Sequence, residues 1–178
     1  PYRGPTFMGW APPPPPPPPP PSTIVFGNKL SGKIPDSFGN LSNLKLLSLG
    51  EYTGGNNFVP GPLAPCIRRL KSLEALFVSS CHVTGAVPAW IGELTALRQL
   101  DLQHNDLSGV LPESLGHLTN LLYLNFKDNI RLGGVLPVLT LGKLRRLNRL
   151  SFVNTDVMSC PTLLRTLQKA LPRCKIWN

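Results

Sequence analysis

The stretch Leu94-Thr-Ala-Leu-Arg-Gln-Leu100-Asp-Leu102-Gln-His-Asn105-Asp-Leu-Ser-Gly-Val-Leu-Pro-Glu-Ser-Leu-Gly-His117 decides the fold. Leu100 and Leu102 are two residues apart, so both side chains point to the same side of an extended strand. Asn105 is expected to end this strand, because its side-chain amide can hydrogen-bond backbone groups in a turn. A Gly-x-x-Pro sequence then shapes the return path, and a further leucine covers the core from the far side.

The same arrangement recurs along the chain in steps of about 24 residues. Each recurrence carries a pair of apolar residues two positions apart, as in a short strand with one buried side. Fixed self-similarity of this length indicates a solenoid, in which stacked neighbours bury the leucines that no single repeat can bury alone. In chain order, the pairs are Thr23/Val25, Leu47/Leu49, Leu76/Val78, Leu100/Leu102, Leu124/Phe126, Leu150/Phe152 and Cys174/Ile176.

The repeat resembles the plant-type leucine-rich repeat, LxxLxxLxLxxNxLxGxxPxxLGx. Residues 28–39 (Asn-Lys-Leu-Ser-Gly-Lys-Ile-Pro-Asp-Ser-Phe-Gly) and 105–116 match this pattern nearly letter for letter. The resemblance covers about residues 22–178 and is similar to the repeats of plant receptor-like kinases, receptor-like proteins and polygalacturonase inhibitors. It implies an α/β repeat fold, a leucine-rich-repeat solenoid with a curved parallel β-sheet on its concave face.

We expect two parts in the chain. Residues 1–21 show no period and are predicted to be disordered, and their run Pro12–Pro21 favours polyproline II. That run is interpreted as a stiff spacer, as a ligand for an SH3, WW or profilin-like domain, or as an artefact of the gene model. Residues 22–178 form the repeat domain of about six repeats. Its C-terminal cap, 159–178, combines a helix beginning at Pro161 with a last strand.

Net charge, hydropathy and cysteine spacing limit the classes of protein to which this chain can belong. The net charge is +9, and eleven of the 18 Lys and Arg residues lie from Leu94 onward. No apolar run approaches the roughly 18–20 residues that a membrane helix needs. The cysteines form no CxxC pair, so neither a metal site nor another cofactor is expected. Cys81 aligns with Asn105, Cys174 aligns with Leu100 as a small core residue, and Cys160 could pair with Cys174 as a C-terminal staple.

Residues between the inward leucines are expected to point out from the concave face. Their mixture of aromatic, amide and charged side chains suits a protein, peptide or carbohydrate partner, and Tyr and Arg are the types that anchor interfaces. We predict ligand binding by Phe77, Gln99, Asp101, Gln103, His104, Tyr123, Asn125, Lys127 and Arg149.

Two other patterns in the sequence could form functional sites. Ser80, His104 and Asp128 occupy one position in three successive repeats, but on an open surface without oxyanion donors, so the chain is predicted not to be an enzyme. Two basic clusters, 68–71 and 143–149, each precede a strand and are expected on one rim. They favour either a solvated edge or attraction to polyanions such as pectin, acidic lipid or nucleic acid. Nucleic acid is disfavoured, since interleaved aromatic residues are missing.

Three functions remain open at this point. The first is recognition of an extracellular ligand by a fragment of a cell-surface receptor-like protein in signalling or defence. The second is a soluble or intracellular repeat scaffold in the cytoplasm, which the unpaired cysteines and the missing signal segment favour. The third, implied by the resemblance, is inhibition of a wall-degrading polygalacturonase.

Overall fold

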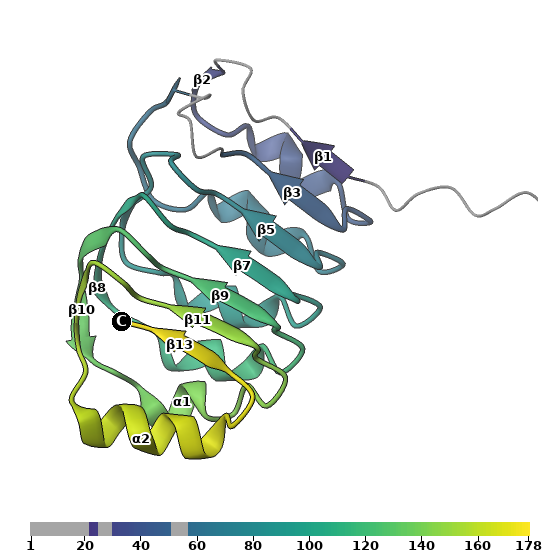
Figure 1. Ribbon diagram of the computed structural model, residues 1–178. Helices are drawn as coiled ribbons and strands as arrows, with labels where there is room; N and C mark the ends of the chain where they lie inside the picture. The colour runs from purple at the N-terminus through teal and green to yellow at the C-terminus, as the bar shows by residue number, and fades with distance from the viewer. Residues whose placement is uncertain (1–21, 25–29, 51–56) are drawn as a thin grey trace, which may run out of the picture.

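The computed structural model describes residues 22–24, 30–50 and 57–178. The predicted disordered segment 1–21, with its run Pro12–Pro21, lies outside the described residues. Within the described chain, one parallel sheet of seven strands runs along the molecule, and the order of its strands is their order in the sequence (Figure 1). The strands are β1 (Ser22–Ile24), β3 (Leu46–Ser48), β5 (Ala75–Phe77), β7 (Gln99–Asp101), β9 (Tyr123–Asn125), β11 (Arg149–Ser151) and β13 (Lys175–Trp177).

The register of this sheet follows the leucine pattern. Leu47 pairs with Leu76, Leu76 with Leu100, Leu100 with Leu124, and Leu124 with Leu150. All five side chains are 0% exposed. Burying each leucine contributes about 1.5–3 kcal/mol relative to leaving it in water. The predicted solenoid and its parallel sheet are therefore confirmed.

The last strand is shifted from its predicted place. The pattern predicts that Cys174 aligns with Leu100, but the register pairs Ile176 with Leu150, so that prediction was wrong by two residues. The chain reaches β13 through a helix instead of the regular turn, and the period no longer fixes the connection there. Cys174 lies in the turn before the strand, where its N–H donates to the carbonyl of Leu171 at 3.0 Å. It is 4% exposed, so its predicted burial in the core is confirmed.

Behind the sheet, short helices return the chain to the start of the next strand (Figure 1). Most of the 3₁₀ helices follow a proline in extended conformation, one follows Ala64, and the helix predicted from Pro161 begins there. The helices are η1 (Asp36–Asn40), η2 (Pro65–Arg69), η3 (Ala89–Glu93), η4 (Glu113–His117), α1 (Val138–Leu141) and α2 (Pro161–Ala170).

Between strand and helix, the repeats form further parallel ladders. Within the described residues these are a pair of strands near the N-terminal end and a four-stranded sheet in the later repeats. The pair is β2 (Ser31–Gly32) with β4 (Asn57–Phe58), and the larger sheet is β6 (Thr84–Gly85), β8 (Asp106–Val110), β10 (Asn129–Val135) and β12 (Thr155–Met158).

All four cysteines lie in the described residues and are free thiols, so the staple that Cys160 and Cys174 could have formed is absent there. Cys160 is exposed, whereas Cys66, Cys81 and Cys174 are buried. Burial raises the pKa of Cys81 to about 12 and that of Cys174 to about 11. These two thiols therefore stay protonated and act as small apolar groups.

Asn105 links two repeats at the end of the strand. Its Oδ1 accepts hydrogen bonds from the backbone N–H groups of Cys81 at 3.1 Å and Val83 at 3.0 Å. Its Nδ2 donates to the carbonyls of Val78 at 2.7 Å and Leu102 at 3.0 Å. The predicted turn role is confirmed, and it extends to the preceding repeat. Asn129 makes three of these four bonds one repeat later, with the N–H of Leu107 and the carbonyls of Leu102 and Phe126.

Replacing Asn105 with Ala is expected to lower the free energy of unfolding by about 2–4 kcal/mol, because several backbone groups would lose their partners at once. Urea unfolding followed by circular dichroism measures this loss. The control is Asn120→Ala, whose exposed amide donates to the Thr95 carbonyl and accepts from Arg146, both at 3.1 Å. Because these groups are solvated, the control is expected to cost under about 0.5 kcal/mol. Equal losses in the two variants would contradict the bridging role.

The 3₁₀ helices stack so closely that one position admits only glycine. A Cβ built on Gly92 in η3 would lie 2.3 Å from the backbone carbonyl oxygen of Ser114 in η4. Since backbone atoms cannot rotate away as a flexible side chain can, any larger residue would push neighbouring repeats apart.

The substitution Gly92→Ala is therefore expected to destabilise the protein by about 1–3 kcal/mol through overpacking. Gly61→Ala is the matched control, because a Cβ there meets only one atom, at 3.9 Å, and the φ angle of Gly61 lies outside the left-handed region. It is expected to be neutral or to stabilise by about 0.4–1 kcal/mol. Thermal melts of the two variants compare them directly, and a neutral Gly92→Ala would refute the close stacking.

Candidate functional site

The register of the sheet places the predicted binding residues in columns on its concave face, away from the 3₁₀ helices. Gln99, Tyr123 and Arg149 are direct neighbours on three successive strands. Phe77 and Asp101 are neighbours in the next column, which continues through Asn125. Because neighbouring strands lie about 4.8 Å apart, side chains within each column can contact one another.

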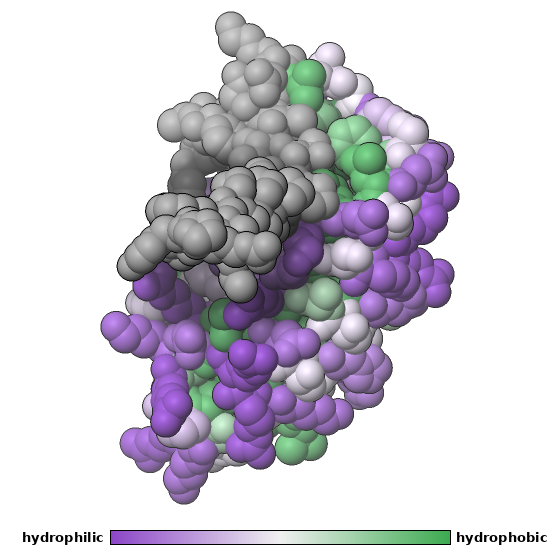
Figure 2. Space-filling view, turned by 90° about the vertical axis from the view of Figure 1, so that its right-hand side faces the viewer, coloured by the Kyte–Doolittle hydropathy of each residue, from purple (hydrophilic) through white to green (hydrophobic). Residues whose placement is uncertain are grey.

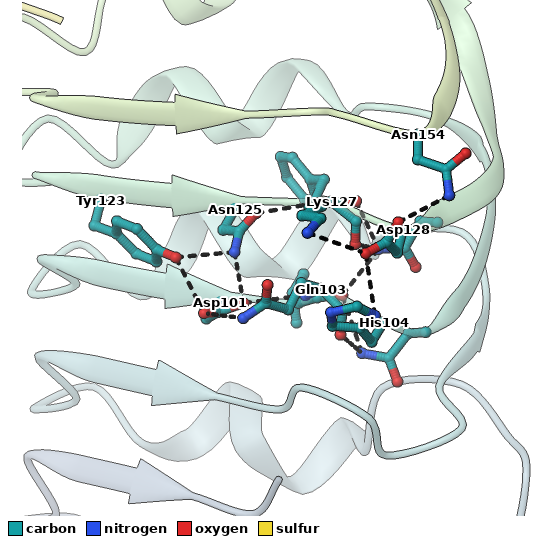
Figure 3. Close-up of polar contacts among 12 residues, drawn as sticks. Asp101, Gln103, His104, Tyr123, Asn125, Lys127, Asp128 and Asn154 are labelled. Atoms are coloured by element: carbon teal, nitrogen blue, oxygen red, sulfur yellow. Dashed lines mark hydrogen bonds and ion pairs between the residues drawn. The ribbon is translucent and has the colours of Figure 1, made fainter. Parts of the chain in front are cut away.

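Asp101 is the centre of a polar network on this face (Figure 3). Its Oδ2 accepts hydrogen bonds from Nε2 of Gln103 at 3.0 Å and from the hydroxyl of Tyr123 at 3.2 Å. Its Oδ1 accepts from Nδ2 of Asn125 at 3.2 Å, and the same Nδ2 donates to the Tyr123 oxygen at 2.9 Å. These bonds hold the phenol ring of Tyr123 in one orientation.

Burial within this network raises the pKa of the Asp101 carboxyl, while hydrogen bonds from the Gln103 backbone, Asn125 and Tyr123 act in the opposite direction. Asp101 is 7% exposed, Asn125 4% and Gln103 1%. Asn125 and Gln103 were predicted to contact ligand, but little of either side chain is accessible. Their place in the structure is to position Asp101 and Tyr123.

A second polar group lies at the carboxyl ends of the strands. Nδ1 of His104 is 3.1 Å from Oδ2 of Asp128, which also lies 3.6 Å from Nζ of Lys127. Nδ2 of Asn154 donates to Oδ1 of Asp128 at 2.8 Å (Figure 3). His104 and Lys127 therefore lie beside Asp128, away from the Tyr123 end of the sheet, and both side chains are partly exposed.

The row Ser80, His104 and Asp128 has a backbone explanation. The three residues have φ angles of 54°, 52° and 55°, and Asn154 follows at 55°. This left-handed conformation is tolerated best by glycine and by short polar residues such as Asn and Asp. The turn therefore favours short polar residues at this position, whatever their chemistry.

Two adjoining hollows on the concave face make one groove. One has a volume of about 440 Å³ and is lined by Asp101, Tyr123, Asn148 and Arg149, among others. The other has a volume of about 600 Å³ and extends the groove to β3. Both hollows are also lined by Phe77, Gln99 and Leu122. Of the predicted set, Phe77, Gln99, Asp101, Tyr123 and Arg149 are thus brought together.

One side of this groove is formed by residues that were not among the predicted binding residues. It is lined by the residues that immediately precede the strands, namely Lys45, Glu74, Arg98, Leu122 and Asn148. These positions could have been found from the sequence, since they recur with the same period as the strand residues.

Charges along this side of the groove are partly paired. Nζ of Lys45 lies 2.9 Å from Oε1 of Glu74, and Nη1 of Arg98 lies 3.8 Å from Oε2. A hydrogen bond from Lys45 lowers the pKa of Glu74. All three side chains are partly exposed, so the pairs are weak and a ligand can displace them.

The described residues contain no group of three or more His, Cys, Asp or Glu side chains that could hold a metal ion. The groove offers a surface for binding, with two aromatic rings, amides, a buried carboxylate and the exposed guanidinium groups of Arg98 and Arg149.

Comparison with known families supports the repeat assignment. A leucine-rich repeat family model matches residues 66–132, and a second one matches residues 24–41. Comparison with curated proteins gives no match.

Solved structures give many matches. The plant peptide hormone receptor RGFR1, in complex with RGF2, is 31% identical over 88% of this chain, with a TM-score of 0.77. The Arabidopsis receptor kinase HAESA, in complex with the peptide hormone IDA and the co-receptor SERK1, is 29% identical over 79% of this chain, with a TM-score of 0.67. A TDR receptor is 30% identical over 83%, with a TM-score of 0.69.

The chain spans about a quarter of the length of these receptor structures: 24% for RGFR1, 25% for HAESA and 24% for the TDR receptor. The shared part consists of the repeats. The sequence pattern, the solenoid and these likenesses show that the chain is built from leucine-rich repeats of the plant type.

Proposed function

We propose that the concave groove binds an extended peptide or a protruding segment of a protein. The observation that carries this proposal is the continuity of the groove, whose two hollows are both lined by Phe77, Gln99 and Leu122. It crosses five strands, from β3 to β11, and so suits an elongated ligand better than a compact one. Phe77, Tyr123 and Arg149 supply the types of side chain that anchor interfaces.

The network under the groove supports the same function. Tyr123 is held by Asp101 and Asn125, so its ring loses little conformational freedom when a ligand packs against it. Arg149 is exposed and lies beside Tyr123 in the sheet. A rigid aromatic residue next to a charged one recognises a segment with an apolar and an acidic residue close together.

The proteins to which the chain is similar support a proposal about its wider role. RGFR1 and HAESA were solved with peptide ligands, and this chain would act in the same way as part of a cell-surface receptor-like protein, in signalling or defence. The groove would then face the outside of the cell. Among the described residues, no helix combines the length and the apolar character needed to cross a membrane.

The binding proposal is tested by selecting peptides from a random displayed library on the purified protein and measuring their affinities by calorimetry. Tyr123→Ala and Arg149→Ala are each expected to weaken the selected peptides by about tenfold or more, as for anchor residues at other interfaces. The control is Arg131→Ala, which removes an exposed arginine paired with Asp106 on the second sheet. It is expected to leave the affinity within about twofold.

Failure to select any peptide, or equal affinities in all three variants, would refute the groove as the binding site. The receptor role has a separate test in the complete transcript that encodes this chain. A signal peptide before the repeats and a membrane span after them would support it. A complete reading frame with neither would favour a soluble scaffold that uses the same groove.

A further inference from the structure

The C-terminal part of the chain is strongly basic. From Asn129 to Asn178 there are nine Lys and Arg residues and one acid, Asp156. The basic cluster in the earlier repeats is different, because Glu93 lies 2.6 Å from Arg68 and 2.8 Å from Lys71. Of the nine basic residues, Arg131 pairs with Asp106, and the other eight form no ion pair within the described part of the chain.

Four of these basic residues gather on two neighbouring strands and the loops that lead into them. Arg149 and Lys175 are paired in the register of β11 and β13, so they lie about one strand spacing apart, roughly 4.8 Å. Arg146 and Arg173 lie in the loops just before these strands, and all four side chains are exposed. Within the described part of the chain, none of the four forms an ion pair.

The loops around this cluster reinforce the basic character. Arg145 donates to the carbonyl of Ala170 at the end of α2, and Arg146 donates to Oδ1 of Asn120, both at 3.1 Å. Neutral oxygens hold these guanidinium groups without cancelling their charge. Figure 2 faces the side from which the loops enter the strands, and hydrophilic side chains cover much of its lower, C-terminal part.

Trp177 adds an apolar surface next to the charges. It lies two residues after Lys175, on the same face of β13, and is paired with Ser151 of β11. Its side chain is 43% exposed although tryptophan is usually well buried. An aromatic ring can pack against the apolar C–H face of a sugar ring. Cations beside it can then bind the carboxylates that the same sugar chain carries.

We propose that this C-terminal basic edge, made of Arg146, Arg149, Arg173, Lys175 and Trp177, binds an acidic polysaccharide of the polyuronate class. A polyuronate presents a carboxylate on each sugar, and the edge presents cations on successive strands. Single-stranded nucleic acid fits less well, since it is bound by several stacking aromatic residues in succession and this edge has one. The site borders the peptide groove at Arg149 but does not depend on peptide binding there.

The test measures binding of size-defined polygalacturonate oligomers by calorimetry, at low salt and at about 0.15 M ionic strength. The double variant Arg173→Glu/Lys175→Glu is expected to lose about tenfold or more in affinity. Its matched control is Arg165→Glu/Lys169→Glu, which makes the same change in net charge on exposed positions of α2. The control is expected to lose no more than about threefold, through long-range attraction alone.

Further variants and probes distinguish stacking and carboxylate binding from unspecific attraction. Trp177→Ala is expected to weaken binding about fivefold at both salt concentrations, since stacking is not screened by ions. Fully methyl-esterified polygalacturonate, which has no charge, is expected not to bind. Equal losses in the two double variants would overturn the proposal in favour of unspecific attraction. Tighter binding of a single-stranded RNA of equal charge would overturn it in favour of nucleic acid.

Discussion

The bridge that Asn105 makes between two repeats is the constraint on which the rest of the structure depends. Where a parallel strand ends and the chain turns, several backbone N–H and carbonyl groups have no ladder partner, and leaving them buried without one is costly. The amide of Asn105 satisfies groups of its own turn and of the repeat before it. It therefore fixes not only the turn but also the distance and register between neighbouring repeats. With the register fixed, every column on the concave face is fixed as well.

This dependence explains why much of the fold was predictable from the sequence. The leucine pairs mark each strand even where the spacing departs from 24 residues, and every pairing from Leu47 to Leu150 matches them. The prediction failed where the period stops, because α2 replaces the regular turn and moves the last strand by two residues. A period can be read from a sequence only while successive repeats use the same connection.

The candidate site was predicted less completely, for a physical reason. Periodicity assigns a side chain to a face of the sheet but not to a depth on that face. Gln103 and Asn125 were placed on the correct face, yet they lie under their neighbours and hydrogen-bond Asp101 instead of facing solvent. Likewise, the polar row that includes His104 follows from a left-handed backbone turn, a feature that residue types alone do not distinguish from a chemical site.

The basic clusters show most clearly that the sequence pattern does not fix the surroundings of a side chain. The basic clusters at 68–71 and 143–149 are alike in sequence and were expected to behave alike. What separates them is the residue one repeat away: Glu93 approaches Arg68 and Lys71, whereas the strand next to Arg149 brings Lys175. In a solenoid, the partner of a side chain is decided by the stacking of repeats about 24 residues apart. The electrostatic character of a surface therefore follows from the alignment of repeats. Whether a basic cluster keeps its positive charge depends on the side chains that the neighbouring repeat places beside it.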